Sequence, residues 1–489
     1  TPPPKENIIR IFTDRAGQIF FAPEDAIVKL RVVKPNLRSN ALWRVRVTDL
    51  WGNVVLEREI ECDTNEIAQV RFGGLGYFDM HVQLCDARGV VRERKFSVGI
   101  VNPLSPKDDA VTSEAPFGIW VGGYGLPKKI GIRWGRRYCQ PWDFEPRGEA
   151  YRWLRHPDEP FELRLPNGKL SWVTYFRGMP KWLTRRPDRP DFLKFPPKDW
   201  NEYARFIQWY VSRTKDKLKV WEVWNEPVPY AYWMGTVEEV VKLHEVTYKA
   251  VHTADPNAVV IGPCPYTFVW WFLERFFELG GAKWIDAISI HTYRPHSDSP
   301  EGTNFAGDLE RLRKLLKPYP HLRDIYITEM GYASWAVGEV RQADYLVRTI
   351  VIALAHGVRV IIWHMFWDWN DKDLEGGHGI LRYDHTPKPA LVAYAVLINQ
   401  LMRAKFIGEV AGLPQKCMGY RFAKDGNEIW VLWCWGEEPV TVRLPIAKRF
   451  IRAVNIMGVN DKVQVEDDAV RITLTEHPKY VWLRIANDD

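Results

Sequence analysis

The spacing of apolar and polar residues divides the chain into three parts, and the first part consists of short alternating segments. Residues 43–47 and 78–84 alternate apolar side chains with polar or charged ones, as a strand with one buried face does. Turn-type residues follow such segments at 51–53 and 86–89. We therefore predict an N-terminal β-sandwich over residues 1–103, with two roles open: support for the next part of the chain, or carbohydrate binding.

A different pattern begins after residues 104–116, a linker rich in proline, serine and acidic residues. Apolar runs of strand length now alternate with helix-like segments, which predicts parallel strands joined by helices. The runs that we interpret as strands cover residues 117–121, 130–136, 171–176, 220–224, 258–262, 287–291, 325–329 and 358–366. Eight such runs predict an α/β fold with a (β/α)8 TIM barrel over residues 117–402. The first connection is so short that its helix is expected to be reduced or missing.

Helix and turn signals support this division. Thr236 and Glu239 have the spacing of a capping box at the start of a helix. The last barrel helix is expected to follow the two prolines in residues 386–389. Beyond it, Asp-Gly-Asn at 425–427 has the composition of a hairpin turn between two strand-like runs. The remainder, residues 403–489, is therefore predicted to be a C-terminal β domain.

Two of the predicted strands end on an acidic residue. The fourth run reads Val-Trp-Glu-Val-Trp-Asn-Glu-Pro and presents Glu226 just before a proline that ends the strand. The seventh run, within residues 324–332, ends on Glu329 and is followed by a glycine. Either acid alone could serve only to stabilise the first turn of the next helix. Because the carboxyl ends of barrel strands carry the chemistry in this fold, the pair predicts a catalytic site.

These two strand ends resemble those of the retaining glycoside hydrolases of clan A. The residues around 221–227, together with His291-Thr292-Tyr293, are most similar to family 39, which includes β-xylosidases, α-L-iduronidases and bacterial exopolysaccharide hydrolases. The resemblance covers only the middle of the chain. It implies that Glu226 is the acid/base and that Glu329 is the nucleophile. Retention requires the two carboxyl groups to lie about 5–5.5 Å apart.

The resemblance also implies roles for four polar residues. Arg136 would hold the nucleophile ionised, and Asn225 would bind the sugar 2-hydroxyl. His291 and Tyr293 would orient the two glutamates. A surface ion pair for Arg136 and a hydrogen-bonded core position for His291 remain the alternatives.

Tryptophan is unusually abundant, with 24 residues, and several lie near predicted strand ends. Their flat rings can stack on sugars, although large core residues account for many of them. The resemblance makes Trp367 the platform beneath the reacting sugar, with Trp363 as a competitor. Trp182 is expected to line an outer subsite.

Composition excludes several other classes. The net charge of +6 is small for 489 residues and is not gathered in a nucleic-acid motif, so no nucleic-acid partner is expected. No apolar run is long enough to cross a membrane. The chain starts at Thr-Pro-Pro-Pro without a signal-peptide pattern, which fits a cytosolic protein or a trimmed exported one, so localisation stays open.

The six cysteines are widely spread and lack metal-ligand spacing, so no zinc site is expected. Cys62 with Cys85, and Cys417 with Cys434, can bridge neighbouring strands in an exported protein, while free buried thiols remain equally compatible.

The sequence thus predicts a cofactor-free retaining β-glycosidase that acts on an oligosaccharide or polysaccharide. The first alternative is a non-catalytic carbohydrate-binding protein on the same scaffold. The second alternative is a phosphate-handling lyase. The sequence argues against it, because no convincing glycine-rich phosphate cradle follows the seventh and eighth strands. The sugar, the linkage and the oligomeric state are not predicted.

Overall fold

The computed structural model describes residues 9–33, 37, 40–120, 125–166, 170–295, 297–370, 376–436 and 438–485. Its centre is a closed barrel of eight strands, each parallel to its neighbours. In barrel order the strands are β9 (Phe117–Trp120), β10 (Trp134–Cys139), β13 (Ser171–Phe176), β14 (Val220–Glu222), β15 (Val259–Pro263), β16 (Ala287–His291), β17 (Ile325–Met330) and β18 (Val360–Trp363). The predicted (β/α)8 fold is confirmed, and every predicted strand overlaps one of these.

Strand ends differ from the prediction at two places that affect the site. The second strand starts at Trp134, not at residue 130, because Gly131 turns the chain there with φ +96°. Ile130 and Ile132 are buried, which explains why their segment resembled a strand. The eighth strand ends at Trp363, three residues before its predicted end. The last residue of the first predicted strand, Val121, lies outside the described residues.

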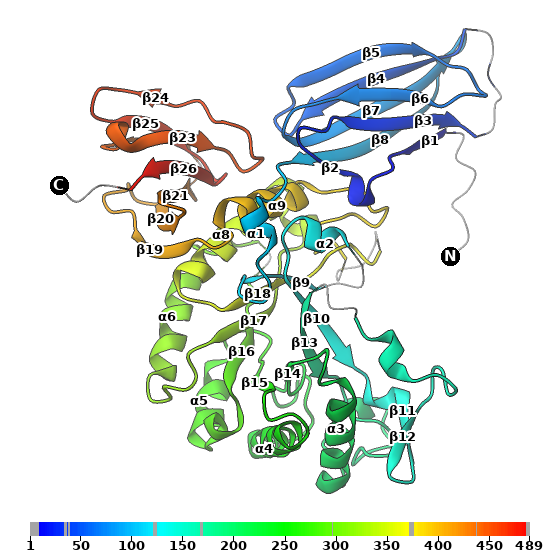
Figure 1. Ribbon diagram of the computed structural model, residues 1–489, viewed down its shortest axis with the longest axis vertical. Helices are drawn as coiled ribbons and strands as arrows, with labels where there is room; N and C mark the ends of the chain where they lie inside the picture. The colour runs from blue at the N-terminus through cyan, green and yellow to red at the C-terminus, as the bar shows by residue number, and fades with distance from the viewer. Residues whose placement is uncertain are drawn as a thin grey trace.

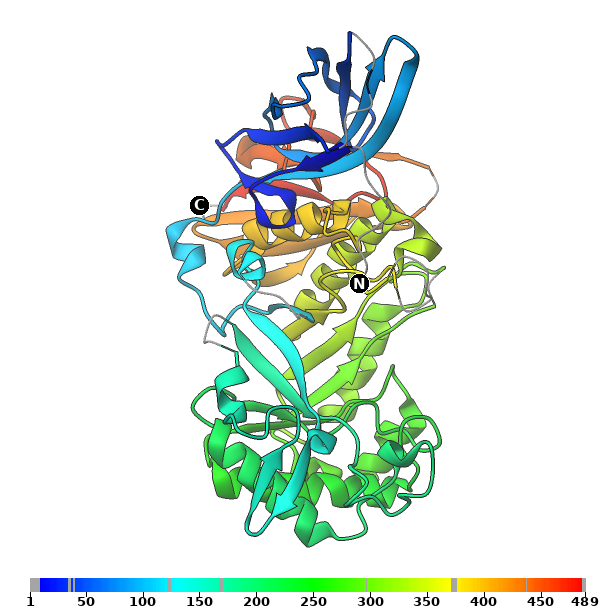
Figure 2. The same cartoon turned by 90° about the vertical axis from the view of Figure 1, so that its right-hand side faces the viewer.

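Helices cover the outside of the barrel from the third strand onward (Figures 1 and 2). They are α3 (Trp200–Thr214), α4 (Val237–Ala254), α5 (Trp270–Glu278), α6 (Phe305–Leu316), α7 (Ser334–Val337), α8 (Glu339–Ala355) and α9 (Pro389–Leu401). In the described part of the connection between the first two strands, the helix is the four-residue α2 (Leu126–Lys129), which agrees with the expected reduction of the first helix. After the second strand, a hairpin of β11 (Phe144–Arg147) and β12 (Ala150–Trp153) stands where a helix would follow.

Local signals explain where some of these helices begin and end. The predicted capping box at α4 is present, since Thr236 and Glu239 bond to each other's backbone N–H groups. Helix α9 is apolar on nearly all sides because it packs against α8 and against β7 and β8 of the N-terminal part. Among the described residues, no helix is long and apolar enough to cross a membrane.

Two β units flank the barrel, on the side where α8 and α9 lie (Figures 1 and 2). The N-terminal unit pairs one sheet of β1 (Ile9–Phe12), β3 (Ala26–Val32) and β6 (Ala68–Phe72) with a second of β2 (Ile19–Phe21), β8 (Gly89–Val101), β7 (Gly76–Asp86), β4 (Leu42–Asp49) and β5 (Val54–Glu61). A shared apolar core lies between the two sheets, as in a sandwich. The short helix α1 (Pro106–Asp109) follows.

The C-terminal unit also has two sheets. One contains β19 (Lys405–Glu409), β20 (Cys417–Lys424), β21 (Asn427–Cys434), β26 (Lys479–Arg484) and β23 (Phe450–Val454), and the other contains β22 (Val440–Leu444), β25 (Val470–Leu474) and β24 (Gln464–Val465). Residues 425–426 form the predicted hairpin turn.

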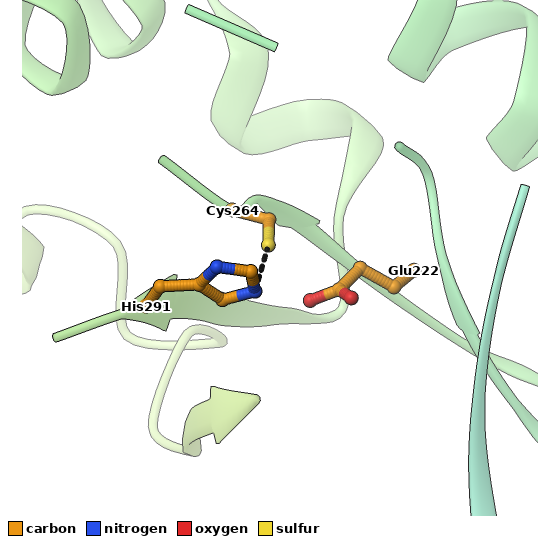
Figure 3. Close-up of side chains that lie close together, drawn as sticks. All are labelled: Glu222, Cys264 and His291. Carbon is orange, nitrogen blue, oxygen red and sulfur yellow. Dashed lines mark hydrogen bonds between the residues drawn. The ribbon is translucent and has the colours of Figure 1, made fainter. Parts of the chain in front are cut away.

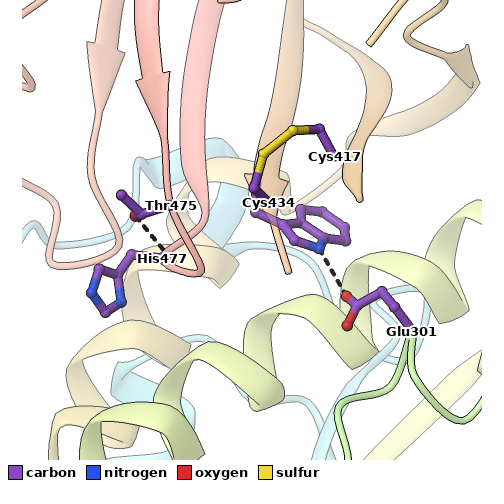
Figure 4. Close-up of a disulfide and its surroundings, with 6 residues drawn as sticks. Glu301, Cys417, Cys434, Thr475 and His477 are labelled. Atoms are coloured by element: carbon purple, nitrogen blue, oxygen red, sulfur yellow. Dashed lines mark hydrogen bonds between the residues drawn. A yellow bond between two sulfur atoms is a disulfide. The ribbon is translucent and has the colours of Figure 1, made fainter. Parts of the chain in front are cut away.

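Two cysteines of the C-terminal unit are joined. Cys417 and Cys434 face each other on β20 and β21 and form a disulfide (Figure 4). The other sequence-based pairing does not occur, since Cys62 and Cys85 are free thiols.

Candidate active site

Glu226 and Glu329 open into one cavity of about 720 Å³ at the carboxyl ends of the barrel strands. Glu226 lies in the loop after β14 with φ +54°, a left-handed backbone conformation that non-glycine residues rarely adopt. Glu329 lies near the end of β17. A carboxylate oxygen of each residue lies within 4.8 Å of the other and of a ring nitrogen of His291. The structure therefore brings together the two acids that the strand count had assigned to the ends of the fourth and seventh strands.

The carboxylate of Glu329 is surrounded by donors. Arg136 donates from Nη1 to Oε1, and the Tyr293 hydroxyl donates to Oε2 at 3.0 Å. Burial alone would raise the pKa of Glu329, but the positive charge of Arg136 and the hydrogen bond from Tyr293 hold this pKa below its ordinary value. Glu329 is therefore ionised throughout the neutral range.

Glu226 has a different environment. Its Oε1 lies 2.7 Å from Nδ1 of His291, and no arginine or lysine among the described residues forms an ion pair with it. Asn225, the preceding residue, accepts a hydrogen bond from Arg136 at 2.9 Å through Oδ1. That bond leaves the Asn225 amide group as a donor toward the cavity, which Asn225 lines.

Arg136 is fully buried and lies within β10, not at its end, because the strand continues to Cys139, three residues beyond its predicted end. Its guanidinium also binds Oε2 of Glu222, with an Nε to Oε2 distance of 2.9 Å, and stacks on the Tyr175 ring at 3.9 Å. The other oxygen of Glu222 accepts from Thr328 at 2.7 Å. The surface ion pair considered for Arg136 is excluded by this burial.

Sequence reasoning missed Glu222, Thr328 and Cys264. A signal existed for Glu222, because an acid within an apolar strand must find a partner when it is buried. The other two are small residues that carry no pattern of their own. Their contacts join different strands: Cys264 Sγ lies 3.2 Å from His291 Nε2 and 3.7 Å from the Thr328 hydroxyl.

Aromatic side chains supply much of the remaining cavity wall. Tyr232, Tyr266 and Trp369 line it and are 47%, 37% and 43% exposed. Trp120, the last residue of β9, lines it as well. Such rings offer faces on which sugars can stack.

Three predicted tryptophans lie elsewhere. Trp367 stacks on His385 and does not line the cavity, so its prediction as the sugar platform is corrected. Trp363, the competitor, is fully buried and donates to the carbonyl oxygen of His378. Trp182 packs on Tyr151 and donates to a backbone carbonyl, also outside the cavity lining.

The reason for the misplaced platform is the early end of β18. His364 follows the strand directly and lines the cavity, whereas residues 366–368 form backbone hydrogen bonds with Trp120 and Leu381. From this region it is His364 and Trp369 that line the cavity.

Three clusters in the described part of the chain bring metal-ligand atoms within 4.8 Å of one another: Glu222–Cys264–His291, Glu226–His291–Glu329 and Asp344–Glu476–His477. In the first two, the carboxylates already accept from Arg136, Thr328 and Tyr293, so a cation would compete with existing donors.

Comparisons with known proteins link the part of the chain that contains both acids to one family. Residues 195–423, which include both acids, match the family model described as glycosyl hydrolases family 39. A β-xylosidase of Geobacillus stearothermophilus is 28% identical over 235 residues, which are 41% of this chain and 46% of that protein. The middle part of the chain is similar to glycoside hydrolase family 39.

A second β-xylosidase, of Caldicellulosiruptor saccharolyticus, gives the same identity over 236 residues, 41% of this chain and 47% of that protein. These matches confirm the predicted resemblance to family 39. The chain spans about half the length of the curated relatives that it matches, so the activity and substrate of the whole protein are proposals.

Solved structures extend the likeness of fold. A family 39 glycoside hydrolase from Bacteroides cellulosilyticus superposes with a TM-score of 0.75 at 18% identity, over 93% of this chain and 97% of that one. A monomeric β-xylosidase from Caulobacter crescentus gives a TM-score of 0.53 at 15% identity, over 77% of this chain and 97% of that one.

Proposed function

We propose that the protein is a retaining glycoside hydrolase that cleaves β-linked, or stereochemically equivalent α-L-linked, glycosidic bonds by double displacement. The observation that carries the proposal is the close approach of two carboxyl groups with unlike surroundings. Oxygens of Glu226 and Glu329 lie within 4.8 Å. This fits the short separation of about 5–5.5 Å in retaining enzymes and is smaller than the separation of about 6.5–9.5 Å in inverting enzymes.

The unlike surroundings divide the two roles. Arg136 and Tyr293 stabilise Glu329 as an anion, the form that a nucleophile needs. Among the described residues, no arginine or lysine forms an ion pair with Glu226, which lines the same cavity. Glu329 is thus the nucleophile and Glu226 the acid/base.

The reaction then has two steps. In the first, a Glu329 oxygen bonds to the anomeric carbon while Glu226 gives its proton to the departing glycosidic oxygen. In the second, Glu226 takes a proton from water as the water oxygen bonds to the same carbon and Glu329 leaves. The Asn225 amide donates to the sugar 2-hydroxyl, a contact that strengthens in the transition state.

The substrate is a carbohydrate whose ring can stack on the exposed faces of Tyr232, Tyr266 and Trp369. Since both curated relatives are named β-xylosidases, an aryl β-xyloside is the first compound to test. The rival function, non-catalytic carbohydrate binding, uses the same rings and leaves the ionised Glu329 without a task.

The experiment is a panel of aryl glycosides and polysaccharides, with proton NMR of the first product of any that is cleaved. We expect hydrolysis of at least one compound and a product with the anomeric configuration of the substrate. Inversion would exclude double displacement. Binding without cleavage of every sugar tested would favour the rival function.

Arg136→Lys tests the support of the nucleophile. We expect kcat/KM to fall roughly 10- to 10²-fold, because the variant loses a charge-assisted hydrogen bond of about 1.5–3 kcal/mol. Arg136 lowers the pKa of Glu329, so a weaker contact lets that pKa rise and moves the acid limb of the pH profile to higher pH. The measurement is kcat/KM against pH, with thermal unfolding to exclude a folding defect.

Arg137→Lys is the matched control for Arg136→Lys. It changes the next residue of β10, whose guanidinium lies 3.5 Å from the Tyr210 hydroxyl, away from both glutamates. An acid limb that stays in place in Arg136→Lys would contradict the role given to Arg136.

A further inference from the structure

Behind Glu226 lies a buried chain of polar side chains that the proposed mechanism leaves without a task. Cys264, just after β15, has its Sγ atom 3.2 Å from Nε2 of His291, as Figure 3 shows. The other ring nitrogen, Nδ1, lies 2.7 Å from Oε1 of Glu226. Cys264 and His291 are both fully buried, so this chain is closed to solvent.

The protonation of the thiol decides what the chain can do. Burial, reinforced by the negative charge of Glu222, raises the pKa of Cys264 above its ordinary value, so Cys264 is a thiol at neutral pH. A thiol can donate its hydrogen to the lone pair of Nε2. Neutral His291 then carries its own hydrogen on Nδ1 and donates it to Oε1 of Glu226. The second oxygen of Glu226 is left to hold the transferable proton.

A second arrangement of the same protons competes with this one. If His291 took the proton of Glu226, the result would be an imidazolium next to a carboxylate, with the same number of protons but no acid for the leaving group. Burial opposes a charged His291, but a negative charge on Cys264, the negative charge of Glu329 and the hydrogen bonds to Cys264 and Glu226 together raise its pKa well above the ordinary value. The largest of these raising causes, the charge on Cys264, is absent when Cys264 is a thiol. Glu222, with an oxygen within 4.8 Å of Sγ and of a ring nitrogen, also favours the charged form.

Charged and titratable groups face this unit from several strands and loops of the barrel. They are Arg136, Glu222, Glu226, Tyr293, Glu329 and His364. With carboxylates on both sides of the ring, the position of one proton between His291 and Glu226 depends on what occupies Nε2.

We propose that the Cys264 thiol is a positioning group: by donating to Nε2 it keeps His291 neutral and keeps the transferable proton on Glu226. This inference rests on the proposed function, because it gives Glu226 the task of proton donor. Cys264 itself touches no reacting atom. Its effect is on the share of enzyme molecules that have the proton in the right place.

The proposal has a kinetic signature that a loosened site lacks. In Cys264→Ala, Nε2 has no donor, and part of the enzyme shifts its proton from Glu226 to His291. The pH-independent rate then falls, roughly tenfold for a substrate with a poor leaving group. The pair formed by Glu226 and His291 holds its transferable proton more tightly by the same factor, because the proton now has a second place to bind. The alkaline limb of the pH profile therefore moves up by about one pH unit. At high pH the two profiles therefore meet.

The test is kcat/KM against pH for the wild-type chain, Cys264→Ala and Cys264→Ser, with a substrate that needs acid help. We expect Ser to restore both the plateau and the limb, because a hydroxyl donates as the thiol does. The backbone at this position is left-handed, with φ +54°. Cysteine, alanine and serine all have a Cβ atom, so neither substitution changes the backbone strain at this position. Cys85→Ala, a buried cysteine in the N-terminal unit, controls for loss of a thiol and should change neither quantity.

Three results would overturn the proposal: a profile lowered by one factor at all pH values, an unchanged profile, or a Ser variant that behaves like Ala. The last would indicate a thiolate–imidazolium pair, which serine cannot form. NMR of ¹⁵N-labelled histidine gives a second readout, with His291 identified by its loss in His291→Asn. We expect a neutral ring protonated at Nδ1 in the wild type and a charged ring in Cys264→Ala. Because this readout needs no turnover, it separates failure of the inference from failure of the proposed function.

Discussion

Glu329→Ala is expected to lower kcat by ~10⁴-fold or more for every substrate, whatever its leaving group. The variant loses the atom that would bond to the anomeric carbon. Of the two nearest described carboxylates, Glu222 is held by Arg136 and Thr328, and Glu226 is engaged as the acid/base. Steady-state kinetics with aryl glycosides of graded leaving-group ability measures the loss. An exposed glutamate of β19, Glu409, provides the control variant Glu409→Ala, which should keep full activity.

Azide should restore part of this activity in Glu329→Ala and reveal which face was lost. The small anion enters the space left by the carboxylate and attacks the anomeric carbon from the nucleophile's side. With an activated aryl β-glycoside the product is then the α-glycosyl azide, of inverted configuration. Formation of the β-azide, or a residual activity close to that of the wild-type protein, would remove Glu329 from the nucleophile role.

The positions of the two acids could be predicted because they depend on local sequence. An apolar run that stops at a proline or glycine marks the carboxyl end of a strand, and the count of such runs assigns each end its place around the barrel. Glu226 and Glu329 needed only that count to be assigned to the same cavity. The resemblance to family 39 then assigned a role to each acid, and it was based on the residues around the same strand ends.

The network around the acids could not be predicted in the same way. Arg136 bonds to Glu222 and Glu329, partners that are 86 and 193 residues away along the chain. Cys264 meets His291 only because β15 and β16 are neighbours and the chain turns left-handed after Pro263. Such contacts follow from strand register and side-chain direction, which the spacing of apolar residues does not encode.

The predicted aromatic platform shows how strongly the choice of a residue depends on the exact end of a strand. Residues 358–366 are apolar almost throughout, so composition cannot locate the end of the eighth strand within them. The strand ends at Trp363, and the next residue, His364, then faces the cavity while Trp367 packs on His385. An error of three residues at a strand end was enough to choose the wrong ring.

Glu226→Gln tests the acid/base and is expected to divide substrates by leaving group. The amide keeps an oxygen that can accept from Nδ1 of His291, so the variant changes the proton and little else. Substrates with poor leaving groups should slow by ~10² to 10⁴, the usual scale of general acid help. Glycosylation by aryl glycosides with good leaving groups needs no proton and should proceed almost normally.

The pH profile and azide give the two checks on Glu226. The alkaline limb comes from loss of the proton that Glu226 donates, so it should flatten in Glu226→Gln, while the acid limb from Glu329 stays at low pH because Arg136 and Tyr293 lower the pKa of Glu329. In Glu226→Ala, azide should attack the glycosyl-enzyme from the face of the missing acid/base and give the β-glycosyl azide, opposite to the product of Glu329→Ala. Equal losses for good and poor leaving groups, with the alkaline limb intact, would exclude Glu226 as the acid/base.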